Sequence, residues 1–230
     1  MFVSGVDDTL LSRNNELGAY SKWELNRMLD EGAKFTLSTM RTPASIMEYL
    51  YDIRLKLPVI CMDGAALYDI RENRYLRKIT IEEDKAEKLC QWLGEEGFHV
   101  FVNRIVEDAC IIHYGSFNNH SEADIYEKMR RSPYRNYIGR EPGRYTDVVY
   151  LMLIDTTQRI DRLYEKMTAV GMTGQYKILK YPSRDYEGYS YIKIYHLDAN
   201  RENMMQYLAD MLQVVKVLRK LYEPVSLRCS

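Results

Sequence analysis

The sequence lacks the features that would place the chain in a membrane or cross-link it. No apolar run approaches the roughly 18–20 residues that a membrane-spanning helix needs. The chain starts on a hydrophobic stretch with no basic region before it, so we expect no signal peptide. The four cysteines form no C-x-x-C pair, which is typical of free thiols in a reducing compartment. We therefore expect a cytoplasmic protein without a membrane partner.

The sequence also lacks a strong charge of either sign and the commonest site motifs. A net charge of −1 gives no general attraction to nucleic acid. The four histidines have no metal-ligand spacing, so we interpret them as structural. There is no P-loop, no dinucleotide-binding glycine pattern and no Ser-His-Asp arrangement. Arginines alternate with tyrosines over 130–145, a mixture that can bind single strands. Given the neutral charge, we interpret it as a solvated loop and expect no nucleic-acid partner.

The first third of the 230-residue chain alternates short apolar runs with amphipathic segments. We predict strands over 1–6, 34–39 and 58–62, and helices over 21–31 and 42–55. This order is typical of a doubly wound α/β domain, in which ligands bind beyond the carboxyl ends of the strands. Asp7, Thr39 and Asp63 all fall at such ends.

Beyond about residue 78 the pattern changes to strands and helices of an α+β domain. We predict helices over 81–93, 122–131 and 157–170, a loop over 132–146, and strands over 98–103, 109–114, 147–154, 176–181 and 189–195. Another helix is expected over 201–222. We therefore divide the chain into a discontinuous α/β core, residues 1–78 and 190–230, and an inserted domain, residues 79–189.

The opening residues carry the most specific pattern of the chain. Residues 2–11 read FVSGVDDTLL. They resemble the first motif of the haloacid dehalogenase-like (HAD) phosphatases, D-x-D-G-T-L after a hydrophobic strand. Two positions depart from it, because Gly5 stands where the nucleophilic Asp is expected and Asp8 stands where Gly is expected. The second acid, Asp7, and the following Thr9 remain.

Three later stretches are similar to the Cof-type branch of the same family. Residues 35–43 resemble its strand followed by T-G-R-T/x-P, with Thr39 at the phosphate-binding hydroxyl and Arg41 at the arginine. Residues 58–65 resemble P-x-I-x-x-N-G-A, with Asp63 in place of Asn. The segment 194–208 is similar to the return from the inserted cap domain to the core, and Arg201 takes the position of a lysine.

The resemblance implies a Rossmann-like, three-layer core with an inserted α/β cap. It implies Mg²⁺-dependent hydrolysis of a phosphate ester on a small metabolite, such as a sugar phosphate. Asp7 would be the general acid/base and a weak metal ligand. Thr39 and Arg201 would bind the phosphate, and Arg41 and Asp63 would bind the substrate.

Two departures bear on activity. Gly5 has no side chain, so the covalent aspartyl-phosphate step has no nucleophile. The family's fourth motif, G-D-x-x-N-D, supplies further Mg²⁺ carboxylates and is absent after 201–222, so we expect a C-terminally truncated core. Asp63 also adds a negative charge near the expected phosphate. The leading hypothesis is a degenerate phosphatase with weak or no catalysis.

Other interpretations stay open. The chain could be an active phosphohydrolase that works through Asp7 or Asp8. It could be a non-catalytic module that binds a phosphorylated ligand or a protein partner. Asp7 and its neighbours could simply cap the loop after the first strand, and Gly5 and Asp8 could be accidental changes in an active lineage. Without a fourth-motif strand, strand 1–6 would lie at a sheet edge, which predicts a homodimer or an aggregation-prone monomer.

Overall fold

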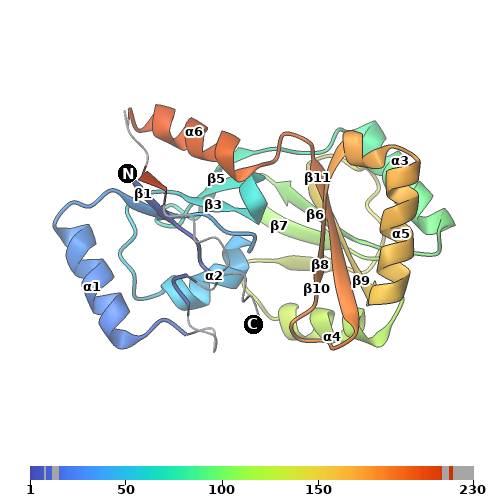
Figure 1. Ribbon diagram of the computed structural model, residues 1–230, viewed down its shortest axis with the longest axis horizontal. Coiled ribbons are helices and arrows are strands. Elements are labelled where there is room, and N and C mark those ends of the chain that lie inside the picture. The colour runs from blue at the N-terminus through green and yellow to red at the C-terminus, as the bar shows by residue number, and fades with distance from the viewer. Residues whose placement is uncertain (8, 12–15, 214–217, 220–230) are drawn as a thin grey trace, which may run out of the picture. The chain divides into compact units, whose positions relative to one another are not determined.

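The computed structural model describes residues 1–7, 9–11, 16–213 and 218–219 (Figure 1). The described residues form two compact units, of which Arg77–Asn200 is one and Met1–Leu76 with the residues from Arg201 onward is the other. The second unit is therefore inserted into the first. No described helix is both long and apolar enough to cross a membrane.

A short parallel sheet, in the order β12-β1-β2, lies in the first unit. It consists of β12 (Leu218–Arg219), β1 (Phe2–Ser4) and β2 (Phe35–Leu37). Helix α1 (Ala19–Asp30) connects β1 to β2, and its Leu25 and Leu29 are buried. Helix α2 (Pro43–Leu50) follows β2 and begins with proline, which is compatible with the first turn of a helix. The strand–helix–strand order expected from the sequence is therefore present.

The third strand departs from a simple parallel sheet. Strand β3 (Val59–Cys61) joins the β2 segment through one parallel bridge, Ser38 to Ile60. It pairs antiparallel with β4 (Ala66–Asp69), and β5 (Arg74–Lys78) completes this second sheet. The sequence analysis did not predict β4 and β5. The turn between β4 and β5 is closed by the Asp69 carboxylate, which accepts hydrogen bonds from the backbone amides of Arg71 and Glu72.

Two expectations about the last part of the chain are wrong. Helix α6 (Arg201–Met211) stops well before residue 222, because Gln213 adopts a left-handed conformation with φ of 51°. Leu218 and Arg219 then form β12, which pairs in parallel with β1. The first strand therefore has a neighbour on each side and is not the edge strand that we expected. Residues 214–217 and 220–222 of the predicted helix lie outside the described residues.

The second unit contains a six-stranded sheet in the order β10-β11-β9-β6-β7-β8. Its strands are β6 (Phe101–Val106), β7 (Ala109–His113), β8 (Asn136–Ile138), β9 (Val148–Thr156), β10 (Tyr176–Pro182) and β11 (Tyr189–His196). All neighbours are antiparallel except β7 and β8. Strand β8 lies where we predicted only a loop. Strand β11 belongs to this unit and not to the core, because it pairs along its length with β9 and β10.

Helices cover both faces of this sheet. Helices α3 (Glu83–Glu95) and α5 (Thr157–Ala169) pack on one face, where Leu89 and Leu163 join a buried cluster with Leu151 of β9 (Figure 1). On the other face, helix α4 (His120–Met129) places Tyr126 against Tyr137 of β8, with ring centroids 5.3 Å apart. The unit therefore has its own hydrophobic core.

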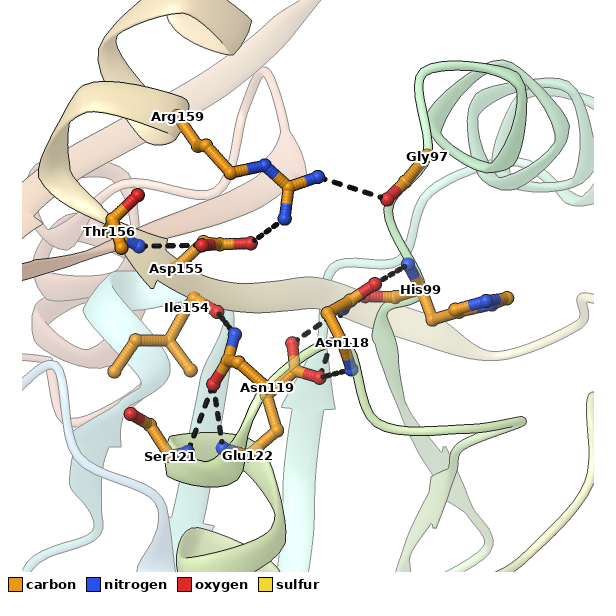
Figure 2. Close-up of polar contacts among 10 residues, drawn as sticks. All are labelled: Gly97, His99, Asn118, Asn119, Ser121, Glu122, Ile154, Asp155, Thr156 and Arg159. Atoms are coloured by element: carbon orange, nitrogen blue, oxygen red, sulfur yellow. Dashed lines mark hydrogen bonds and ion pairs between the residues drawn. The ribbon is translucent and has the colours of Figure 1, made fainter.

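A buried polar network joins the start of α4 to the neighbouring segments (Figure 2). Asn119 caps the helix, since its side-chain oxygen accepts hydrogen bonds from the amides of Ser121 and Glu122. Glu122 is only 2% exposed and accepts a hydrogen bond of 2.6 Å from the Asn118 backbone amide. Burial raises the pKa of the Glu122 carboxyl to about 7. The sequence analysis did not single out this residue.

Candidate active site of the first unit

The carboxyl ends of three strands meet at one edge of the first unit. Ser38 donates a backbone hydrogen bond of 2.8 Å to the Ser4 carbonyl, which brings the residues after β1 and β2 together. Thr39 donates a backbone hydrogen bond of 2.9 Å to the Ile60 carbonyl, which adds the end of β3. Gly5, the residue at the expected nucleophile position, directly follows β1. The edge therefore collects residues that the sequence analysis placed at separate strand ends.

Asp7 is held by an arginine from the next strand end. Arg41 donates two hydrogen bonds to Asp7 Oδ1, from Nε at 2.9 Å and from Nη2 at 2.6 Å. The side chains are 21% exposed for Arg41 and 25% for Asp7. Burial alone would lower the pKa of the Arg41 guanidinium, but its contacts with Asp7 raise the pKa overall. A permanently charged guanidinium therefore neutralises the carboxylate that was predicted as general acid/base.

Thr39 lies at the centre of this edge and is 1% exposed. Its hydroxyl oxygen accepts a hydrogen bond of 3.1 Å from the Arg41 amide, and its carbonyl accepts one of 2.9 Å from the Asp63 amide. The Met62 amide donates to the Arg41 carbonyl at 2.9 Å. These bonds fix the two loops against each other. The hydroxyl of Thr39 keeps its own proton, which can be donated to an anion.

Asp63 and Arg201 form a second ion pair. Arg201 Nε donates to Asp63 Oδ1 at 2.6 Å, and the side chains are 40% exposed for Arg201 and 13% for Asp63. Arg201 is the first residue of α6, whereas Asp63 lies in a tight turn after β3 with φ of 56° and ψ of 34°. Short polar residues such as Asp and Asn tolerate this left-handed conformation best. Both residues of the pair depart from the motifs described above.

The space around Gly5 can hold a larger residue. A Cβ atom added there would lie 3.1 Å from Thr9 Oγ1 and 4.0 Å from the Asp7 carbonyl oxygen. The first distance is tight, but the contact is with a side-chain hydroxyl at a loop, which can move slightly. Asp8, the other replacement in this motif, lies outside the described residues.

The side chains of this edge do not fit a magnesium ion. Mg²⁺ binds through carboxylate oxygens together with water and substrate oxygens. Gly5 offers no side-chain ligand, and the carboxylates of Asp7 and Asp63 each face an arginine. Throughout the part of the chain that the structure describes, no three His, Cys, Asp or Glu side chains gather into a metal-binding group.

The sequence profile of the haloacid dehalogenase-like hydrolases matches residues 2–216. The chain belongs to this family. A comparison with curated proteins gives no match. The fold of this HAD-like protein is similar to that of a haloacid dehalogenase-like hydrolase from Bacteroides thetaiotaomicron, with a TM-score of 0.72 and 11% identity over 95% of this chain and 79% of the other. It is also similar to TM0651 from Thermotoga maritima, with a TM-score of 0.72 and 18% identity over 95% and 78% of the two chains.

A third solved structure is described as the subclass IIB sugar phosphatase BT4131. It matches the HAD-like chain with a TM-score of 0.64 and 13% identity, over 95% of this chain and 78% of the other. At these identities the likeness shows the fold alone. It supports the α/β core with a second α/β unit that the sequence analysis expected.

The structure brings five of the predicted site residues into one connected network: Asp7, Thr39, Arg41, Asp63 and Arg201. Which acid meets which arginine could not be expected from the sequence. No local pattern could have shown it, since the partners are 34 residues apart in one pair and 138 in the other. Arg41, which the resemblance places near the substrate, forms an ion pair with Asp7 in the structure.

Proposed function

We propose that this chain is a phosphatase-family protein that has weak or no catalytic activity and keeps a site for a small phosphorylated ligand. The observation that carries the proposal is Gly5. It directly follows β1, beside the paired Asp7, at the position where the family's nucleophile is expected. An aspartyl-phosphate cannot form on a residue without a side chain.

The surrounding residues still support recognition of an anion. Thr39 supplies a buried hydroxyl, and Arg41 and Arg201 supply two guanidinium groups at the same edge. Hydroxyl groups, backbone amides and arginines are common phosphate ligands in proteins. Magnesium, which the family implies as cofactor, has a poor set of side-chain ligands here. A small phosphorylated metabolite is therefore the ligand class that we propose.

The rival activity is hydrolysis through Asp7 or Asp8. Asp7 is a poor candidate for nucleophile, because the Arg41 guanidinium holds its carboxylate through two hydrogen bonds. Bonds to a cation stabilise the carboxylate and reduce its tendency to attack. The geometry therefore favours binding over turnover.

The test is hydrolysis of an aryl phosphate with and without Mg²⁺. The parent chain is compared with the Gly5→Asp/Asp8→Gly double variant, which restores the first motif. We expect no Mg²⁺-stimulated turnover by the parent and measurable turnover by the double variant. Loss of a catalytic nucleophile costs up to about 10⁶-fold in kcat in a serine protease, so even partial restoration is detectable.

A matched control is Gly18→Asp, which adds a carboxylate to the same unit at an exposed glycine with no heavy atom near its added Cβ. It should remain as inactive as the parent. Turnover by the parent that disappears in Asp7→Asn would contradict the proposal and assign the reaction to Asp7. If the parent and the double variant are both inactive, the proposal of a non-catalytic chain stands, and the defect extends beyond the nucleophile.

A further inference from the structure

We propose that Asp63 limits phosphate binding at this edge by holding Arg201 and by placing a negative charge beside the anion site. The inference rests on the phosphate site of the proposed function and goes beyond it, because it assigns the control of affinity to one residue. The decisive contact is the ion pair between Arg201 Nε and Asp63 Oδ1, at 2.6 Å.

The carboxylate is the fixed partner of this pair. Asp63 donates its backbone amide to the Thr39 carbonyl at 2.9 Å and lies in a left-handed turn with φ of 56°. Arg201 is a long side chain at the start of α6 and is 40% exposed. A flexible arginine can turn towards a bound anion, but only when it gives up its contact with the carboxylate.

The charge of Asp63 opposes a phosphate independently of that contact. Its side chain is 13% exposed, so solvent and salt screen it less than a surface carboxylate. The residue is bonded through its backbone to Thr39, the expected phosphate ligand. Like charges brought together in a binding site carry a large energetic penalty. A phosphate dianion therefore meets both a neutralised arginine and a nearby negative group.

Replacement by asparagine separates this role from a structural one. Asn tolerates the left-handed conformation as well as Asp does, so Asp63→Asn removes the charge and keeps the turn. The matched control is Asp30→Asn in the same unit, which breaks another carboxylate–arginine pair of 2.6 Å, between Asp30 and Arg54. That pair lies on the exposed surface of α1, outside the connected site network.

The experiment is calorimetric titration with inorganic phosphate at constant ionic strength, on the full chain and on Asp63→Asn. We expect Asp63→Asn to bind phosphate about tenfold more tightly than the parent. Asp30→Asn should bind like the parent. Adding Arg201→Gln to Asp63→Asn should remove most of the gain, because the released guanidinium is its main source, and should leave the smaller part that comes from removing the negative charge. Thermal unfolding of each variant shows whether the fold is kept.

Equal affinity of the parent and a folded Asp63→Asn would overturn the inference, as would a gain that survives Arg201→Gln undiminished. No detectable phosphate binding by Asp63→Asn would also overturn it. If Asp63→Asn unfolds, Asp63→Ser serves as a second uncharged variant under the same criteria. Equal, measurable affinity would contradict only this inference, whereas no phosphate binding by the parent or any variant would also contradict the site of the proposed function, so the two failures can be told apart.

Discussion

The two units of the chain differ in how they accommodate buried carboxylates. In the first unit, Asp7 and Asp63 each face a guanidinium, so the negative charge is balanced within the pair. In the second unit, Glu122 is more deeply buried, and its carboxylate accepts hydrogen bonds from the backbone and side-chain amides of Asn118. Amides satisfy hydrogen bonds but do not balance a charge. The two arrangements therefore predict different responses to pH and to mutation.

The network around Glu122 shows why its charge is costly. Asp155, also buried, lies close enough for its negative charge to raise the pKa of Glu122 further, after the larger effect of burial. The nearby cation, Arg159, is bound to Asp155 at 2.5 Å and to the Gly97 carbonyl (Figure 2). The Asn118 amides lower the pKa, but less than burial raises it. The carboxyl consequently favours its protonated form.

The largest expected effect is a loss of stability as the pH rises. The folded-state pKa of Glu122 is raised from 4.5 to about 7. The stabilisation of the folded state by the protonated carboxyl is therefore fully present below pH 4.5 and is lost as the pH rises through 7. A rise of this size corresponds to at most about 3 kcal/mol. Urea unfolding at pH 5 and pH 8, followed by circular dichroism, measures the difference.

Glu122→Gln should remove most of this pH dependence, since glutamine does not titrate. Glu127→Gln on the same helix is the control, because Glu127 is exposed and pairs with Arg130. It should keep the pH dependence of the parent. If Glu122→Gln loses as much stability as the parent between pH 5 and pH 8, the pH dependence of stability does not come from Glu122.

A smaller effect is expected from breaking an arginine pair in the first unit. Arg41→Met leaves the Asp7 carboxylate partly buried without its guanidinium and should cost about 1–2 kcal/mol in the free energy of unfolding. Adding Asp7→Asn should recover a large part of this loss, because the unbalanced charge is then gone. The double-mutant cycle, measured by urea unfolding, gives the coupling energy directly. A coupling energy near zero would mean that Arg41 and Asp7 contribute to stability independently of each other.

Much of the first unit could be predicted from the sequence because its signals are local. The apolar run before Asp7, the helical spacing around Leu25 and the proline at the start of α2 each act over a few residues. The same reasoning placed Thr39 and Asp63 at strand ends, where the structure has them. What it could not supply was the pairing of Asp7 with Arg41, which depends on how separate strands align.

The predictions that were wrong depended on distant contacts. Apolar residues at steps of three or four after Arg201 favoured one long helix, but pairing with β1 draws Leu218 and Arg219 into a strand. Strand β8 was taken for a loop because its neighbours are rich in proline and glycine, yet it pairs with β7 over three residues. Glu122 gave no signal at all, since burial of a glutamate depends on the tertiary fold around it. Local patterns therefore predict helices and strands better than they predict which segments pack or pair together.

The smallest expected change in the free energy of unfolding comes from substituting Gly5, an uncharged residue of the first unit. Gly5→Ala reduces the conformational freedom of the unfolded chain, which stabilises a protein by about 0.4–1 kcal/mol where the backbone permits. The added Cβ would meet Thr9 Oγ1 at 3.1 Å, a tight contact that offsets part of this gain. We therefore expect a change within about 0.5 kcal/mol of the parent in urea unfolding.

Gly5→Ala also isolates the chemistry of the position from its packing. The Gly5→Ala variant should hydrolyse aryl phosphate no faster than the parent, whereas the Gly5→Asp/Asp8→Gly double variant should gain turnover. A severe loss of stability in Gly5→Ala would show that glycine is required by the fold at this strand end, which would make the missing nucleophile a consequence of packing. A neutral result leaves the loss of the carboxylate as the functional difference, at a site where Asp7 and Asp63 are each paired with an arginine.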